Sequence, residues 1–255
     1  MVRKWQAIVL LTVVVVAIGG CASDRQARQR DARLVRIYTQ LGAGFFKRDQ
    51  IAFAEQEVKK ALAINSDDSD ANNVMALVQA RLKHYRRAGR YFRRAVSNKP
   101  DNAGAQNNYG VFLCERGHVR KALTHFRKAI NNPLYASPQW ANVNAANCLL
   151  KSGKPLPAKG YFKQALKLQP NLGIALYELA AIDLKSGHPH RARAYIRRYF
   201  AVAPESPQSL FLAARVEQAL GDIDKQAMYS LRLTSKYPDS RQAKELERLG
   251  ASGEL

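Results

Sequence analysis

The sequence predicts an all-α protein made of stacked helix-turn-helix pairs that follow a short N-terminal export signal. The first observation is a period of 34 to 36 residues that runs through most of the 255-residue chain. The second is that each period carries apolar side chains at helical spacing, and the third is a proline after most of these stripes. Since one helix pair cannot bury its own apolar face, three or more pairs must stack.

The N-terminus has the pattern of a bacterial lipoprotein signal. Arg3 and Lys4 precede an apolar run over residues 7–20, and these 14 residues are fewer than the ~17–25 of a membrane span. The stretch "VAIGGCAS" that ends this run resembles a lipobox, in which small residues precede the cysteine that becomes residue one. The resemblance implies a signal peptide over 1–20 and acylation of Cys21, a covalent lipid with no other cofactor. The alternative is an ordinary cleaved signal with an accidental cysteine.

The residues after Cys21 predict where the protein resides. Ala22 stands at the second mature position, where an aspartate is associated with retention at the inner membrane. The resemblance to sorted lipoproteins therefore implies the periplasmic face of the outer membrane. Residues 21–34 are rich in arginine and poor in apolar side chains, so we expect a lipidated N-terminus followed by a solvated tether.

The charge of the chain favours acidic partners or anionic surfaces. The full chain has 41 basic and 20 acidic residues, and loss of Arg3 and Lys4 with the signal leaves a net charge of +19. A high pI is often read as nucleic-acid binding. An exported, lipidated chain rarely meets nucleic acid, and no nucleic-acid-binding motif appears, so we expect no nucleic-acid partner.

The repeat is seen by aligning the segments that open with an alanine. The aligned alanines are Ala54, Ala88, Ala122, Ala158, Ala192 and Ala227, at intervals of 34, 34, 36, 34 and 35. Four residues later stand Val58, Phe92, Phe126, Phe162, Ile196 and Leu231. Seven residues after the alanines stand Ala61, Ala95, Ala129, Ala165, Tyr199 and Thr234. These positions share one helical stripe, and the prolines that follow at Pro100, Pro170, Pro204 and Pro238 end the helix.

With a second apolar segment before each alanine, the unit resembles the tetratricopeptide repeat, which implies an all-α tetratricopeptide-repeat superhelix. Gly42 and Gly110 occupy the small-residue position of the first helix, with alanines elsewhere. The predicted array spans 35–240, and residues 241–255 are expected to be a C-terminal tail that frays after a last helical piece. The predicted repeats are 35–68, 69–102, 103–138, 139–172, 173–206 and a degenerate 207–240.

The first helices are expected to line a concave wall, where repeat arrays hold peptides. Their inward positions form a candidate trough for an amphipathic helix or an apolar strand. The candidate groove residues are Ala43, Phe46, Asn73, Leu77, Ala80, Asn107 and Val111. Ordinary packing between repeats is an equally weighted alternative, and the asparagines are either ligands for a partner backbone or solvated side chains.

Two further features lie within the array. Cys114 and Cys148 fall on the first helices of neighbouring repeats, and an oxidising compartment favours a disulfide, with two buried free thiols as the alternative. The third repeat is two residues longer, in "INNPLYASPQW". This connection is either a tolerated insertion, which we favour, or a contact edge.

Arginine clusters on two second helices predict a basic convex face. The functional interpretation is docking to an anionic lipid or an acidic partner, and a solvated basic face is slightly favoured. The clustered residues are Arg86, Arg87, Arg90, Arg93 and Arg94, then Arg191, Arg193, Arg197 and Arg198. His188 and His190 lack a third ligand for a metal, and no catalytic motif appears, so we expect neither a metal site nor an enzyme.

Four stretches are more specific than the repeat. "NNYGVFLCERG" (107–117), "NPLYASP" (132–138), "NVNAANCLLKSG" (142–153) and "SKYPDS" (235–240) closely resemble the type IV pilus biogenesis and stability lipoprotein family, PilF/PilW. The resemblance, from Cys21 to about residue 240, implies an outer-membrane pilotin. Such a protein binds the pilus secretin and supports its outer-membrane localisation and multimer assembly for pilus biogenesis and twitching motility. The alternative is a general periplasmic scaffold of envelope or peptidoglycan assembly.

Overall fold

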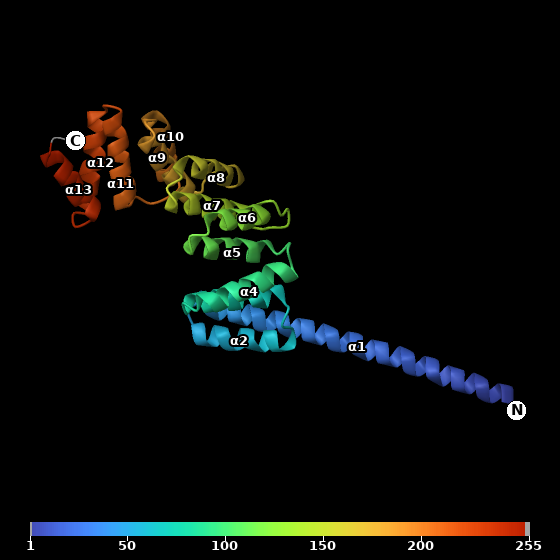
Figure 1. Ribbon diagram of the computed structural model, residues 1–255. Helices are drawn as coiled ribbons and strands as arrows, with labels where there is room; N and C mark the ends of the chain where they lie inside the picture. The colour runs from blue at the N-terminus through green and yellow to red at the C-terminus, as the bar shows by residue number, and fades with distance from the viewer. Residues whose placement is uncertain (1, 253–255) are drawn as a thin grey trace. The chain divides into compact units, whose positions relative to one another are not determined.

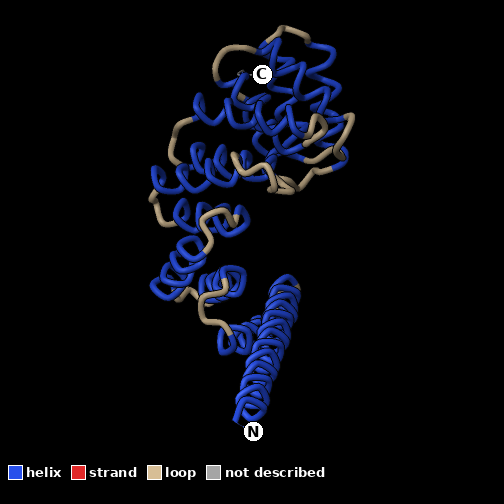
Figure 2. The backbone as a smooth tube through the Cα atoms, turned by 90° about the vertical axis from the view of Figure 1, so that its right-hand side faces the viewer, coloured by secondary structure: helices blue, strands red, loops and turns tan. Residues whose placement is uncertain are grey.

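The computed structural model describes the backbone over residues 2–252 and the side chains over residues 25–252. Across the described residues the chain forms 13 helices and no strand, and Figure 2 shows the short loops that join them. The predicted fold class, an all-α array of paired helices, is therefore confirmed. The chain divides into two compact units, residues 1–112 and 113–255. The expected signal peptide (1–20) and the side chain of Cys21 lie outside the described side chains.

The first unit consists of antiparallel helix pairs, with α1 against α2 and α3 against α4 (Figure 1). Its helices are α1 (Val2–Lys47), α2 (Ile51–Ile64), α3 (Ser69–Arg81), α4 (Tyr85–Asn98) and most of α5 (Ala103–Glu115). Its core includes Val35, Val58, Val74 and Met75, all buried, so the apolar stripes of α1, α2 and α3 meet in one cluster.

The second unit continues the same pairing and ends in an additional helix. Its helices after α5 are α6 (Val119–Ile130), α7 (Pro138–Lys151), α8 (Pro155–Leu168), α9 (Gly173–Lys185), α10 (Pro189–Phe200), α11 (Pro207–Ala219), α12 (Ile223–Lys236) and α13 (Arg241–Ala251). α7 packs on α8, α9 on α10 and α11 on α12. Phe162, Leu176 and Leu179 are fully buried in one of its core clusters.

The stripe read from the sequence is the buried face of each second helix in the first five repeats. The three phenylalanines of the stripe, Phe92, Phe126 and Phe162, have no exposed surface. The small residue of the first helix permits close approach. A Cβ added to Gly42 would lie 2.4 Å from Cγ2 of Val58 and 3.2 Å from the carbonyl oxygen of Ala54. Only a residue without a side chain therefore allows α1 to lie this close to α2.

The register predicted for the sixth repeat is wrong by one residue. Ala227 and Leu231 are exposed, and Leu231 retains 67% of its accessible surface. The fully buried side chain of α12 is Leu233, which follows Tyr199 by 34 residues, as Pro238 follows Pro204. The predicted register places Ala227 at the repeat position that Ala192 occupies in the fifth repeat. The 34-residue spacing instead puts the polar Gln226 at this position, so the neighbouring alanine is misleading as a marker of the repeat.

Both ends of the array are more helical than the sequence indicates. Residues 241–251, expected as part of a C-terminal tail, form α13, which packs on α11 and α12 and buries Ala243, Leu246 and Leu249. Residues 21–34, expected as a tether, belong to α1, and the side chains from Arg25 to Arg30 are exposed. A polar segment can form a helix without burying a face when a packed helix continues it. Among the described residues, no helix combines the length and apolarity needed to cross a membrane.

Candidate partner-binding surfaces

The candidate trough on α1, α3 and α5 is made of half-buried side chains. Ala43 and Phe46 pack against the core cluster of the first unit, and the guanidinium of Arg81 lies 5.9 Å from the centre of the Phe46 ring. Arg81 is held in turn by Asp49 at 3.0 Å. Leu77, Ala80 and Val111 are also only partly buried. These side chains therefore contribute to packing between helices and still present apolar surface.

The asparagines of this wall contact one another. Nδ2 of Asn108 donates to Oδ1 of Asn73 at 3.2 Å, and Nδ2 of Asn107 donates to Oδ1 of Asn108 at 3.4 Å. Asn107 is buried, with 9% of its surface exposed. Asn73, half-buried, retains its own amide donors for a partner backbone. The structure thus joins the predicted Asn73 and Asn107 through Asn108 into a chain of amides between neighbouring repeats.

A second concave surface was not found from the sequence. We call it the C-terminal pocket. Its cavity of about 520 Å³ lies on α9, α11 and α13. The lining residues are Tyr177, Leu184, Gln208, Phe211, Leu212, Arg215, Arg241, Gln242 and Glu245. Burial, with smaller contributions from Glu178 and Tyr199, raises the pKa of Tyr177. The inward positions of repeats five and six would have indicated this wall, but the packed α13 could not be read from them.

Four of the five arginines predicted on α4 gather around a cavity of about 540 Å³ on the first unit, which we call the arginine pocket. The lining residues are Glu55 and Lys59 of α2, Met75 and Gln79 of α3, and Arg87, Arg90, Tyr91, Arg93 and Arg94 of α4. Arg86 is the predicted residue that does not line it.

The arginines predicted on α10 behave differently, because Arg193 is held by acids. Its guanidinium donates hydrogen bonds to Glu217 and lies 3.0 Å from Asp222. These carboxylates raise the pKa of Arg193, and the hydrogen bond that it donates to Glu217 is the main cause. Lys159 of α8 makes the equivalent ion pair with the fully buried Asp183 of α9. Each basic residue precedes its acid by 24 positions, so these pairs join the second helix of one repeat to the first helix of the next.

The longer third connection forms one side of a cavity of about 710 Å³, which we call the loop pocket. It includes Pro133 and Tyr135 of the connection and Tyr161 and Leu168 of α8. Burial raises the pKa of the Tyr135 hydroxyl. Leu134 at the tip of the connection is 91% exposed. The insertion therefore creates an apolar surface as well as lengthening the chain.

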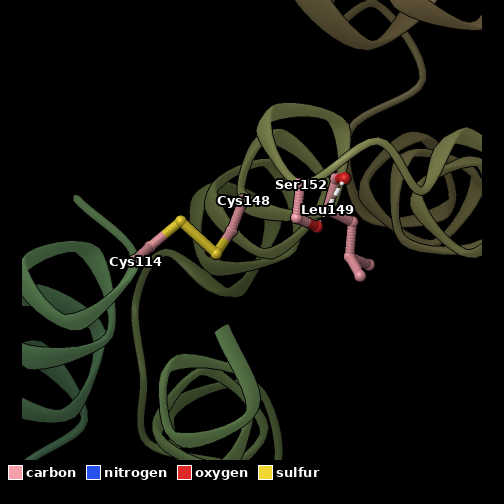
Figure 3. The surroundings of a disulfide bond; sticks show 4 residues. All are labelled: Cys114, Cys148, Leu149 and Ser152. Atoms are coloured by element: carbon pink, nitrogen blue, oxygen red, sulfur yellow. Dashed lines mark hydrogen bonds between the residues drawn. A yellow bond between two sulfur atoms is a disulfide. The ribbon is translucent and has the colours of Figure 1, made fainter. Parts of the chain in front are cut away.

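Cys114 and Cys148 are joined by a disulfide, shown in Figure 3, with their Cα atoms 5.7 Å apart. Cys114 lies near the end of α5 and Cys148 on α7, so the bridge connects the first helices of repeats three and four within the second unit. Of the two alternatives read from the sequence, the structure contains the bridge and not the free thiols.

His188 and His190 lie at the start of α10, and both side chains are exposed. In the part of the chain that the structure describes, no three His, Cys, Asp or Glu side chains gather as a metal ion would require. The surfaces described above present apolar side chains, amide groups and charge.

Comparison with protein families identifies the repeat. A family described as tetratricopeptide repeat matches residues 73–139 and 177–241, and a second profile of the same description matches 141–172. Among curated protein sequences, none matched the chain.

Solved structures give a more specific likeness. Pseudomonas aeruginosa PilF is 28% identical, with a TM-score of 0.77, over 86% of this chain and 98% of that chain. PilW, described as a widely conserved type IV pilus biogenesis factor, is 30% identical, with a TM-score of 0.72, over 83% of this chain and 97% of that one. YrrB, a tetratricopeptide-repeat protein described as having an unusual peptide-binding site, is 17% identical with a TM-score of 0.62, which supports the fold alone.

Proposed function

Because the chain belongs to the tetratricopeptide-repeat family and within it to the type IV pilus proteins PilF and PilW, we propose that it is a pilotin. In this role it binds the type IV pilus secretin, supports localisation of the secretin in the outer membrane and promotes its assembly into multimers. The protein itself is held at the periplasmic face of the outer membrane by lipid on Cys21.

The observation that carries the proposal is the extent of the likeness to PilW. The two chains are 30% identical, and the match covers 83% of this chain and 97% of that one, so it extends over most of the repeat array. A shared repeat alone would support only a general scaffold. The likeness supports a role in pilus biogenesis, and the lipobox pattern supports the membrane location.

The trough of the first unit is the proposed contact for the secretin. It combines half-buried apolar side chains, such as Phe46 and Leu77, with the amide chain from Asn73 to Asn107. An amphipathic helix or an apolar strand of the secretin would cover the apolar side chains and accept hydrogen bonds from the amides. This role requires binding and no catalysis, so we propose that the protein is not an enzyme.

The first test is deletion of the gene, followed by membrane fractionation and immunoblotting of the secretin. The expected result is loss of the secretin multimer and accumulation of monomer at the inner membrane, with loss of twitching. Multimer that persists in the outer membrane would refute the pilotin role. That result would favour the alternative, a general periplasmic scaffold of envelope or peptidoglycan assembly.

The second test examines the trough directly. Phe46→Glu and Leu77→Glu place a charge among half-buried apolar side chains, so each should weaken secretin binding at least roughly tenfold. The matched control is Leu134→Glu, which adds the same charge at the exposed tip of the third connection in the other unit. Wild-type affinity in folded trough variants would exclude the trough, and an equal loss in the control would show an effect of charge alone.

A further inference from the structure

The arginine pocket of the first unit has no part in the proposed secretin contact. The trough uses inward residues of α1, α3 and α5. The walls of the arginine pocket come from the second helices α2 and α4, and α3 supplies its floor. With a cavity of about 540 Å³, it has the size of a small-ligand site and is too small for a partner helix.

The pocket contains unbalanced positive charge. Five basic side chains line it, against the single carboxylate of Glu55. That carboxylate is already engaged, by Lys59 at 2.9 Å and by the amide of Gln79 at 3.3 Å. Arg94 lies 3.8 Å from Asp67, a weak surface pair. Among the described side chains, no carboxylate lies within ion-pairing distance of the other three arginines, Arg87, Arg90 and Arg93.

Comparison with later repeats explains the excess charge. At the equivalent interfaces, α8 presents Lys159 to Asp183 of α9, and α10 presents Arg193 to Glu217 of α11. At the α2–α3 interface of the first unit the acid lies on the second helix instead, because α2 presents Glu55 and α3 presents the neutral Gln79. The first helix α3 therefore places no acid in the pocket that could offset the positive charge of the α4 arginines.

The floor of the pocket strengthens the interaction of its charges with an anion. Met75 and Gln79 are almost fully buried, with 1% and 3% of their surfaces exposed. Gln79 is fixed at both ends of its amide, by Glu55 and by Nδ1 of His84 at 3.1 Å. A floor that is buried and held by hydrogen bonds lowers the local dielectric constant and the screening by salt.

We propose that the arginine pocket binds a phosphate group, and specifically the phosphate of an anionic lipid headgroup. Guanidinium groups form paired hydrogen bonds with phosphate oxygens and lose less solvation energy than ammonium groups do. An acidic protein segment would present carboxylates spread along a chain, which suits an open face better than a concave pocket of this size.

The assignment to lipid rests on the proposed anchor at Cys21, whereas the phosphate site itself does not. α1 packs on α2, and the first buried side chain in its described part, from residue 25 onward, is Val35, 14 residues after Cys21. Fourteen helical residues span about 21 Å. An anchor at this distance leaves α2 and α4 within reach of the headgroups, and basic side chains that reach the surface are attracted to anionic lipid.

The test measures binding of defined probes to the full-length protein in a neutral detergent by titration calorimetry. The probes are monomeric dihexanoyl phosphatidylglycerol, the phosphatidylcholine of the same chain length, inorganic phosphate and a decaglutamate peptide. The test variant is Arg90→Gln with Arg93→Gln. The matched control is Arg191→Gln with Arg197→Gln, which removes the same charge from exposed positions of α10. Thermal unfolding by circular dichroism verifies that both variants fold.

We expect phosphatidylglycerol to bind better than phosphatidylcholine, and the α4 variant to bind it roughly 10- to 30-fold more weakly. The α10 control should stay within about twofold of wild type. Inorganic phosphate that binds as tightly as phosphatidylglycerol supports the phosphate site and identifies free phosphate as its source. An equal loss in both variants, or binding of decaglutamate without binding of any phosphate probe, overturns the proposal. The secretin blot is independent of this titration, so failure of one is distinguishable from failure of the other.

Discussion

At the scale of single residues, one backbone conformation recurs in every repeat. The turn between the two helices contains a residue with positive φ at Asp49, Lys83, Gly117, Gly153, Gly187 and Gly221. In each turn the next residue donates its backbone N–H five residues back, as His118 does to Leu113 at 2.8 Å. This bond ends the first helix in a Schellman motif, for which glycine is the preferred residue. The first two repeats use other residues and therefore carry strain.

Replacement of Lys83, whose φ is 61°, by glycine should stabilise the protein. A side chain in the left-handed region costs about 1–2 kcal/mol, and the extra chain entropy of glycine offsets part of this. We expect Lys83→Gly to raise the free energy of unfolding of the first unit by about 0.5–1 kcal/mol in urea titration. Gly187→Ala, at the matching position, should have the opposite sign, and a stabilising Gly187→Ala would refute the account.

Glu205 predicts a dependence of stability on pH. Lys236 at 2.5 Å and Arg232 at 2.9 Å bond its carboxylate, and the hydrogen bond from Lys236 is the main cause of its lowered pKa. A carboxyl with a lowered pKa stabilises the folded state above its unfolded pKa of about 4.3, and the effect disappears as pH falls through the folded pKa. Glu205→Gln should therefore lower the urea midpoint at pH 7, and the difference from wild type should vanish near about pH 3.

The control for this experiment is Glu247→Gln, at an exposed position of α13. It removes the same charge, and none of the described ion pairs includes Glu247. Its urea midpoint should follow wild type at both pH values. A Glu205→Gln difference that stays constant from pH 7 to pH 3 would rule out the ion pairs as its cause.

At the scale of helices, neighbouring elements are joined by close approach and by a recurring polar position. Gly42 allows α1 to approach α2, and the positions 24 residues apart in sequence connect one repeat to the next. Lys159–Asp183 and Arg193–Glu217 fill that position with ion pairs, and Glu55–Gln79 fills it with a hydrogen bond. The same geometry therefore yields a neutralised interface in the second unit and a basic pocket in the first.

Gly42→Ala should destabilise the α1–α2 pair. Its Cβ would lie 2.4 Å from Cγ2 of Val58, a distance that forces one helix or one side chain to shift. Overpacking of this kind costs about 1–3 kcal/mol, which urea unfolding followed by circular dichroism would detect. The matched control is Gly160→Ala on α8, where nothing lies within 4 Å of the added Cβ. Alanine there should be neutral or stabilising, and equal effects at both sites would refute close approach as the cause.

At the scale of the whole molecule, the described helices account for the repeat array and its C-terminal end. α13 covers the sixth repeat by burying Leu246 and Leu249, as capping helices do in repeat arrays. At the other end, α1 continues from the first repeat toward the residues of the predicted signal. The proposed anchor and the binding surfaces thus belong to one continuous chain of helices.

Replacement of Cys21 tests the anchor. Stable attachment to a bilayer requires two or more acyl chains. The resemblance to a lipobox predicts that these chains are attached at Cys21. We expect Cys21→Ala to release the protein from the outer-membrane fraction, as measured by density-gradient fractionation and immunoblotting. Ser23→Ala, two residues away, should remain in that fraction. Unchanged retention of Cys21→Ala would contradict lipidation, and the ordinary-signal alternative would take its place.

The sequence by itself determined the properties that depend on local spacing. The 34-residue period, the apolar stripe through Phe92, Phe126 and Phe162, and the small residue at Gly42 follow from helical geometry, and each predicted the correct buried face. The four stretches that resemble the PilF/PilW family also predicted the likeness to PilF and PilW, which the solved structures confirm. In the sixth repeat an alanine suggested the wrong register, because Gln226 and Ser230 replace the usual markers.

Only the tertiary structure decided which charges are free and which surfaces are hollow. Arg193 and Arg90 look alike in sequence, but an acid 24 residues after Arg193 pairs with it, whereas no described carboxylate pairs with Arg90. The packing of α13 and the cavity behind the third connection also needed the fold. The physical reason is that charge pairing and concavity depend on contacts between neighbouring repeats, and these contacts join residues that a local pattern does not relate.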